Sequence, residues 1–203
     1  EISVMMAQFP SRTIAQKSFD YRTLGLGYAN LGSLLMMQGI PYDSEQAIQP
    51  GDRLMEYIQE KAHAASAELA AKRGTYPQWE GSVHEQAGKR MRNACVTAIP
   101  PTGTISMLAD VSGGCEPNFA LSYVKNVMGT ELVYTNPAFE QAAQQHGFFS
   151  PDLMRKVAQL GSVKGIREIP DDVKRIFVTG MDISPEWHVK MQAAFQKHTE
   201  DAV

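Results

Sequence analysis

Helical periodicity is clearest in the second quarter of the chain. Apolar residues recur there three or four positions apart, and charged residues occupy the positions between them. The apolar set is Leu54, Met55, Ile58, Ala62, Ala65 and Leu69, and the charged set is Glu56, Glu60, Lys61 and Glu68. This pattern predicts a long amphipathic helix. Because Pro50 and Gly51 precede it, we expect the helix to begin at about Asp52.

A second apolar stretch covers residues 24–37 and is interrupted by glycines. We predict a helix here too, closed by Gly39 and Pro41. Each internal glycine costs a helix roughly 1 kcal/mol relative to alanine. We therefore expect this helix to pack closely against a neighbouring element. The glycines concerned are Gly25, Gly27 and Gly32.

The remaining pattern alternates between short extended segments and helices. Residues 94–99 favour β structure and run into two prolines, which cannot donate to a sheet and therefore end the strand. Residues 74–89 are predicted to form a loop. Strands separated by helices indicate an α/β fold. The other predicted elements are a strand at 119–124, an extended piece at 131–135, proline-opened helices at 136–145 and 150–160, and a last helix from 184 that buries Trp187, Met191, Ala194 and Phe195.

Composition indicates a globular chain and excludes several classes of function. The 203 residues are 43% hydrophobic and 20% charged, which is enough to form a core. The net charge of −3 gives no electrostatic reason to expect a nucleic-acid partner. No apolar stretch approaches the ~20 residues that span a bilayer, so we expect no membrane partner. Two cysteines indicate neither a disulfide scaffold nor a zinc site, and the cytoplasm is the expected location.

A turn rich in small residues follows the predicted strand at 94–99 and opens a helix. Free backbone N–H groups at such a helix start can bind phosphate, and Gly103 lets a phosphate approach the backbone. The same residues have a simpler interpretation, in which Thr102 or Thr104 is an N-cap that satisfies the helix start without a ligand. The chain contains neither Gly-x-x-x-x-Gly-Lys nor Gly-x-Gly-x-x-Gly, so this is not one of the widespread phosphate loops.

Several motifs, in order along nearly the whole chain, resemble the catalytic subunit of ribonucleotide reductase. The chain is most similar to the class II branch, which depends on adenosylcobalamin (vitamin B12). The motifs are Arg92-Asn93-Ala94, Pro101-Thr102-Gly103-Thr104-Ile105-Ser106, Gly114-Cys115-Glu116-Pro117-Asn118-Phe119-Ala120-Leu121, the segment from Tyr21 to Gly32, Gly39-Ile40-Pro41-Tyr42-Asp43-Ser44, Pro185-Glu186-Trp187-His188, and Gln192-Ala193-Ala194-Phe195-Gln196.

The resemblance implies a fold and a site. It implies that residues 1–203 are one internal segment, incomplete at both ends, of the ten-stranded α/β barrel of the ribonucleotide reductase and pyruvate formate-lyase type. It assigns substrate-phosphate binding to Pro101, Thr102, Gly103, Thr104, Ile105 and Ser106, which we call the phosphate loop. It also places residues 113–119 on a loop near the mouth of the active site, with Gly113, Gly114, Glu116 and Pro117 as possible site residues.

The resemblance further implies a ribonucleoside-diphosphate reductase that makes deoxyribonucleotides for DNA synthesis by radical chemistry. Its cofactor would be adenosylcobalamin, and its partners would be the ribonucleotide substrate, a thioredoxin-type reductant and the remainder of the barrel. In this family a radical cysteine lies in an Asn-Pro-Cys-x-Glu motif, which this chain lacks. We therefore assign no catalytic residue here and expect the segment alone to be inactive. Cys95 and Cys115 are interpreted as packing residues.

Other polar residues give weaker indications. The five histidines are scattered, so we predict no metal site. His188, Gln192 and Gln196 share a helix face that either reaches substrate or is solvated. Two alternatives to a class II reductase stay open. One is a non-catalytic nucleotide-phosphate-binding module, and the other is a segment of a class I large subunit, which receives its radical from a separate metal-containing subunit.

Overall fold

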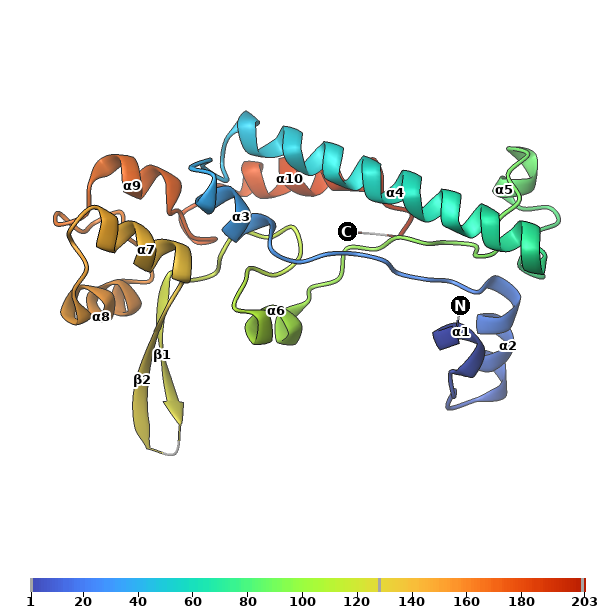
Figure 1. Ribbon diagram of the computed structural model, residues 1–203, viewed down its shortest axis with the longest axis horizontal. Helices are drawn as coiled ribbons and strands as arrows, with labels where there is room; N and C mark the ends of the chain where they lie inside the picture. The colour runs from blue at the N-terminus through green and yellow to red at the C-terminus, as the bar shows by residue number, and fades with distance from the viewer. Residues whose placement is uncertain (1, 128, 202) are drawn as a thin grey trace. The chain divides into compact units, whose positions relative to one another are not determined.

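The computed structural model describes residues 2–127, 129–201 and 203 (Figure 1). The chain divides into two compact units. Unit 1 comprises residues 1–27, 53–100 and 196–203, and unit 2 comprises residues 28–52 and 101–195. The expectation that the whole chain is one segment of a larger barrel domain stays a prediction.

Unit 1 consists of helices joined by extended chain. Its helices are α1 (Ile2–Met6), α2 (Arg12–Tyr21), the part of α4 (Glu45–Arg73) that follows residue 52, and α5 (Val83–Gln86). Ser11 caps the start of α2, since its hydroxyl accepts from the N–H of Ile14. The segment at 74–89, predicted to be a loop, contains a short helix, α5. The Ser82 hydroxyl caps this helix by accepting from the N–H of Glu85.

A buried polar cluster lies beside α4 in unit 1. The Ser66 hydroxyl donates to the Oδ1 atom of Asn93 at 3.0 Å and accepts from the backbone N–H groups of Arg92 and Asn93. The Nδ2 atom of Asn93 donates to the carbonyl of Arg22 at 2.8 Å. This cluster explains the Arg-Asn-Ala motif as a structural feature, because it holds the start of the segment at 94–100.

The prediction of a regular strand at residues 94–99 is wrong. The segment is extended, but among the described residues it has a single β-bridge, a parallel one between Leu26 and Thr97. Flanking hydrogen bonds join Leu24 N–H to the Cys95 carbonyl at 2.9 Å and Ala98 N–H to the Leu26 carbonyl at 3.1 Å. The pairing is thus too short for a ladder.

The helix predicted over residues 24–37 is also wrong in its first half, because α3 covers only Leu31–Met37. Of the preceding residues, Leu24 and Leu26 instead pair with the segment at 95–98. A Cβ at Gly27 would overlap the carbonyl oxygen of Ala98, and a Cβ at Gly25 would be 3.2 Å from the Cβ of Ala98. The glycines therefore allow two extended segments to approach each other, rather than a helix to pack.

The long helix begins earlier than predicted. The α4 helix begins at Glu45 and continues through Pro50, despite the backbone N–H that proline lacks. Gly51 fits because it packs against α10 (Pro185–Gln196), where a Cβ would be 2.8 Å from the Phe195 ring. The break expected from Pro50-Gly51 does not occur.

Unit 2 contains most of the buried apolar side chains around α3, α7 (Pro137–Gln145), α8 (Pro151–Leu160) and α9 (Asp171–Ile176). The predicted starts of α7 and α8 are confirmed, since the side chains of Asn136 and Ser150 cap them. The buried core consists of Met36, Leu121, Phe139, Ala143, Leu153, Met154, Val157, Val163, Ile166, Ile169, Val173 and Phe177.

An antiparallel hairpin extends from this core (Figure 1). Its strands are β1 (Ser122–Val127) and β2 (Thr130–Thr135), with Ser122 opposite Thr135 and Tyr123 opposite Tyr134. The strand predicted at 119–124 thus begins three residues later, and the extended piece predicted at 131–135 is confirmed.

The last predicted helix is α10. Met191, Ala194 and Phe195 are buried as expected, whereas Trp187 is only half-buried. No described helix is long and apolar enough to cross a membrane.

Candidate functional site

The phosphate loop ends in a short helix, α6 (Gly103–Ala109). Thr102 occupies the N-cap position with φ +51°, a left-handed conformation that is uncommon for a residue with a side chain. Its hydroxyl does not cap the helix. Instead, the Oγ1 atom accepts a hydrogen bond from the N–H of Gly114 at 2.8 Å. The simple N-cap interpretation is therefore wrong, and Thr102 joins the phosphate loop to the loop at 113–119.

The first turn of α6 has backbone donors available. The first intrahelical bond runs from the N–H of Ser106 to the carbonyl of Thr102 at 2.9 Å. Within the described residues, no acceptor contacts the N–H groups of Gly103, Thr104 or Ile105. These three N–H groups lie in the first turn of α6, where the helix dipole favours an anion.

The side chains of the phosphate loop contribute less than its backbone. The Ser106 hydroxyl is buried and donates to the Gly103 carbonyl at 3.0 Å. Ile105 is apolar and exposed, and Pro101 has no N–H. Thr104 is exposed and carries a hydroxyl. Anion binding at this loop would accordingly use backbone N–H groups, with Thr104 as the available side-chain donor.

The loop at 113–119 packs directly against the phosphate loop. A Cβ at Gly113 would be 2.9 Å from the Pro101 carbonyl oxygen and 3.1 Å from the Oε2 atom of Glu116. A Cβ at Gly32 in α3 would likewise be 2.8 Å from the Glu116 carbonyl oxygen. Small residues are needed at both positions because the backbones approach so closely. The Glu116 carboxylate therefore lies beside the phosphate loop.

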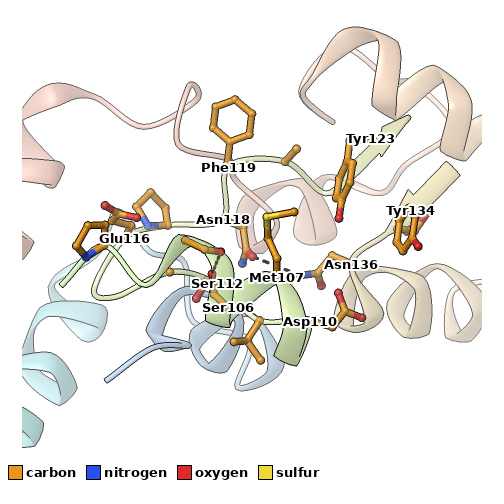
Figure 2. Close-up of a pocket in the computed structure, with 17 residues that line it drawn as sticks. Ser106, Met107, Asp110, Ser112, Glu116, Asn118, Phe119, Tyr123, Tyr134 and Asn136 are labelled. Atoms are coloured by element: carbon orange, nitrogen blue, oxygen red, sulfur yellow. Dashed lines mark hydrogen bonds between the residues drawn. The ribbon is translucent and has the colours of Figure 1, made fainter. Parts of the chain in front are cut away.

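A pocket of about 440 Å³ runs along one face of α6 (Figure 2). Several residues singled out from the sequence line it, namely Pro101, Gly103, Ser106, Gly113, Glu116 and Pro117. Thr102, Thr104, Ile105 and Gly114 do not line it. Asn118 and Phe119, in the loop at 113–119, line it too. Pocket residues that the sequence did not indicate include Met107, Asp110, Tyr123, Tyr134 and Asn136. A hairpin pairing of the two extended segments would have placed Tyr123 beside Tyr134.

Neither cysteine has the environment of an activated thiol. Burial, followed by the nearby Glu116 carboxylate, raises the pKa of the Cys115 thiol to about 11. Burial and the carboxylates of Asp201 and Glu200 raise the pKa of the Cys95 thiol to about 11. A thiol must ionise to act as a nucleophile or metal ligand. These pKa values favour the packing interpretation of both cysteines.

The histidines have protein partners. His188 lies with its Nε2 atom 3.1 Å from the Gly180 carbonyl, and the Nε2 atom of His63 is 2.7 Å from the Glu200 carboxylate. Gln192 and Gln196 are exposed on α10. Among residues 2–127, 129–201 and 203, no group of three or more His, Cys, Asp or Glu side chains could hold a metal ion.

Comparison with known proteins gives a consistent result. The family model described as "Ribonucleotide reductase, barrel domain" matches residues 1–203. The chain is 41% identical over 198 residues to a vitamin B12-dependent ribonucleoside-diphosphate reductase of Mycobacterium tuberculosis, covering 98% of this chain and 28% of that protein. It is 42% identical over 197 residues to the protein of the same name from Thermoplasma acidophilum, covering 97% and 26%.

A solved structure is similar as well. The class Id ribonucleotide reductase alpha subunit of Actinobacillus ureae matches with a TM-score of 0.77 and 28% identity, covering 92% of this chain and 33% of that one. The chain thus spans about a quarter to a third of the length of these relatives.

Proposed function

This chain belongs to the ribonucleotide reductase family, as part of its α/β barrel domain, and on that premise we propose that it forms part of an enzyme that reduces ribonucleotides to deoxyribonucleotides. The more similar relatives named above are B12-dependent ribonucleoside-diphosphate reductases, which supports the class II assignment and a diphosphate substrate. The alpha subunit of Actinobacillus ureae is less identical in sequence and represents the class I alternative.

The contribution we assign to this chain is binding of the substrate phosphates. The free N–H groups of Gly103, Thr104 and Ile105 are the observation that carries this assignment. They would donate to phosphate oxygens, with the dipole of α6 behind them. Glu116, beside the loop, would accept from a sugar hydroxyl rather than contact the phosphate. Holding the phosphates fixes the position of the ribose, and such positioning lowers the barrier of the chemical step.

The whole protein would use adenosylcobalamin as its source of radicals, in line with the names of its relatives. The described residues do not fit this group. They offer no cluster of metal ligands, and the pocket has a volume suited to a smaller ligand. We therefore assign no step through the cofactor to these residues. A thioredoxin-type reductant, the remainder of the barrel and a cytoplasmic location complete the proposal.

The substitution Gly103→Ala tests the phosphate loop. A Cβ at Gly103 would meet no protein atom within 4 Å, so the variant should fold normally. The new methyl group would project from the pocket wall, where it would obstruct a bound phosphate. In the intact protein we expect the KM for ribonucleoside diphosphates to rise about tenfold or more. The assay is formation of deoxyribonucleotide with adenosylcobalamin and a dithiol.

Gly165→Ala is the matched control, because a Cβ at Gly165 also meets no atom within 4 Å but lies outside the pocket. Its KM should equal that of the wild type. An unchanged KM for Gly103→Ala would exclude phosphate binding at this loop. Nucleotide binding without turnover in the intact wild-type protein would favour the non-catalytic binding module instead.

A further inference from the structure

A buried tyrosine holds the middle of the loop at 113–119. Tyr42 follows α3 in the chain and is only 4% exposed. Its hydroxyl donates to the carbonyl of Cys115 at 2.6 Å, and the two residues are 73 positions apart in the sequence. That carbonyl belongs to the planar peptide group that joins Cys115 to Glu116. The hydrogen bond from Tyr42 therefore fixes the backbone from which the Glu116 side chain projects.

The residues on either side of this peptide group are held as well. The Ser112 hydroxyl accepts from the N–H of Ser33 in α3 at 3.1 Å, and the Ser33 hydroxyl donates to the Oδ1 atom of Asn118 at 3.2 Å. Ser112, Cys115 and Asn118 are buried. Glu116, by contrast, is exposed and lines the pocket (Figure 2). The loop thus presents one acidic side chain from a backbone held on both sides of it.

The Glu116 carboxylate lies near Tyr42 as well as near the pocket. Burial, followed by the Cys115 thiol and then the Glu116 carboxylate, raises the pKa of the Tyr42 hydroxyl above its ordinary value. The hydroxyl therefore stays protonated and remains a hydrogen-bond donor throughout the neutral range. Tyr42 itself does not line the pocket. Any effect of its hydroxyl on a bound ligand must accordingly pass through the loop at 113–119.

We propose that Tyr42 is a positioning residue for the reaction of the intact protein. Its hydrogen bond to the Cys115 carbonyl holds the Glu116 carboxylate in the orientation in which that carboxylate accepts from a hydroxyl group of the substrate. Activity is sensitive to small displacements of groups that orient a substrate. This inference rests on the proposed function, because that function supplies the contact between Glu116 and the substrate. It does not depend on where the phosphates bind.

A double-mutant cycle on the intact protein tests this role, with kcat/KM for deoxyribonucleotide formation as the readout. Tyr42→Phe keeps the buried ring and removes only the donor. We expect kcat/KM to fall about threefold to tenfold, the loss expected from one hydrogen bond. Glu116→Ala should lower kcat/KM at least as much. Adding Tyr42→Phe to Glu116→Ala should then cause no further loss, because the carboxylate that Tyr42 positions is already absent.

Tyr76→Phe is the matched control, since Tyr76 is 2% exposed and lies outside the pocket. Its kcat/KM should equal that of the wild type. All variants are assayed at a temperature at which circular dichroism shows them to be folded, so that activity is compared between folded proteins.

A purely structural role for Tyr42 gives a different pattern. Tyr42→Phe would then lower kcat/KM by the same factor whether residue 116 is glutamate or alanine, and this result would overturn the proposal. Wild-type kcat/KM in either single variant, Tyr42→Phe or Glu116→Ala, would overturn it too. The phosphate-binding part of the proposed function fails by a separate result, in which Gly103→Ala leaves the KM unchanged.

Discussion

At the residue scale, Thr102 combines an unfavourable backbone conformation with a hydrogen bond that only its hydroxyl can accept. Its φ of +51° is unfavourable for a side chain with a branched Cβ, yet its hydroxyl is what accepts from Gly114. A glycine would relieve the backbone and lose the hydrogen bond. The threonine is therefore explained by the connection between two loops, and not by capping of α6.

Replacing Thr102 by valine keeps the shape and removes the acceptor for the Gly114 N–H. Because Gly114 is buried, that N–H would be left unsatisfied, and we expect the free energy of unfolding to fall by about 1–3 kcal/mol. Denaturant titration of the intact protein measures this. Thr102→Ser retains the hydroxyl and should be close to wild type, so equal stability of the serine and valine variants would contradict the role.

The raised pKa values of the cysteines predict how their reactivity depends on pH. Their pKa values of about 11, against an ordinary value of 9.0, mean that both thiols stay protonated through the neutral range. Alkylation by iodoacetamide requires the thiolate, so the rate at Cys95 should continue to rise up to about pH 11. Mass spectrometry of the labelled peptides follows this. A rate that levels off near pH 8 would show that the thiol is activated.

The same reasoning predicts that Cys95→Ser and Cys115→Ser leave turnover of the intact enzyme largely unchanged. Neither thiol is ionised at neutral pH, and neither lies in an Asn-Pro-Cys-x-Glu motif. Deoxyribonucleotide formation by each single variant is the measurement. Near-complete loss in either variant would contradict the packing interpretation.

At the scale of elements, sequence patterns predicted what is locally determined. The starts of α7 and α8 were predictable because Asn136 and Ser150 supply their own caps before a proline. A helix was predicted at 24–30 and a regular strand at 94–99, and both predictions were wrong. The extended conformation of each segment is stabilised by hydrogen bonds between Leu24 or Leu26 and residues 95–98, which are distant in the sequence. Glycine spacing in an apolar run fits both a helix contact and two extended chains in close approach, and only the Ala98 carbonyl near Gly27 decides between them.

At Gly51 in α4, helix propensity favours a change to alanine, whereas packing against Phe195 opposes it. Alanine is the better helix former by roughly 1 kcal/mol, but its Cβ would be 2.8 Å from the fully buried Phe195 ring. Overpacking of a closed site costs about 1–3 kcal/mol, so Gly51→Ala should reduce stability overall. The measurement is the unfolding midpoint in denaturant. Adding Phe195→Leu makes space for the methyl group and should remove most of the penalty of Gly51→Ala.

At the scale of the whole molecule, the site was only partly predictable. The phosphate loop could be found because its residues are consecutive in the sequence. Asp110, Tyr123 and Tyr134 could not, because they reach the pocket through the end of α6 and through the register of a hairpin. Family membership assigns the chain to a barrel domain but does not give these positions, which follow from the folded arrangement of unit 2.

Burial is unevenly distributed over the same unit. The core around Phe139 and Val157 is closed to solvent, whereas the single buried residue of α6 is Ser106, and Leu108 is 83% exposed. A seven-residue helix has little stability of its own and gains little here from packing. Its amide protons should therefore exchange with deuterium much faster than those of α7 and α8. A nucleotide that engages the first turn would slow that exchange, so local order in α6 would be acquired from its ligand.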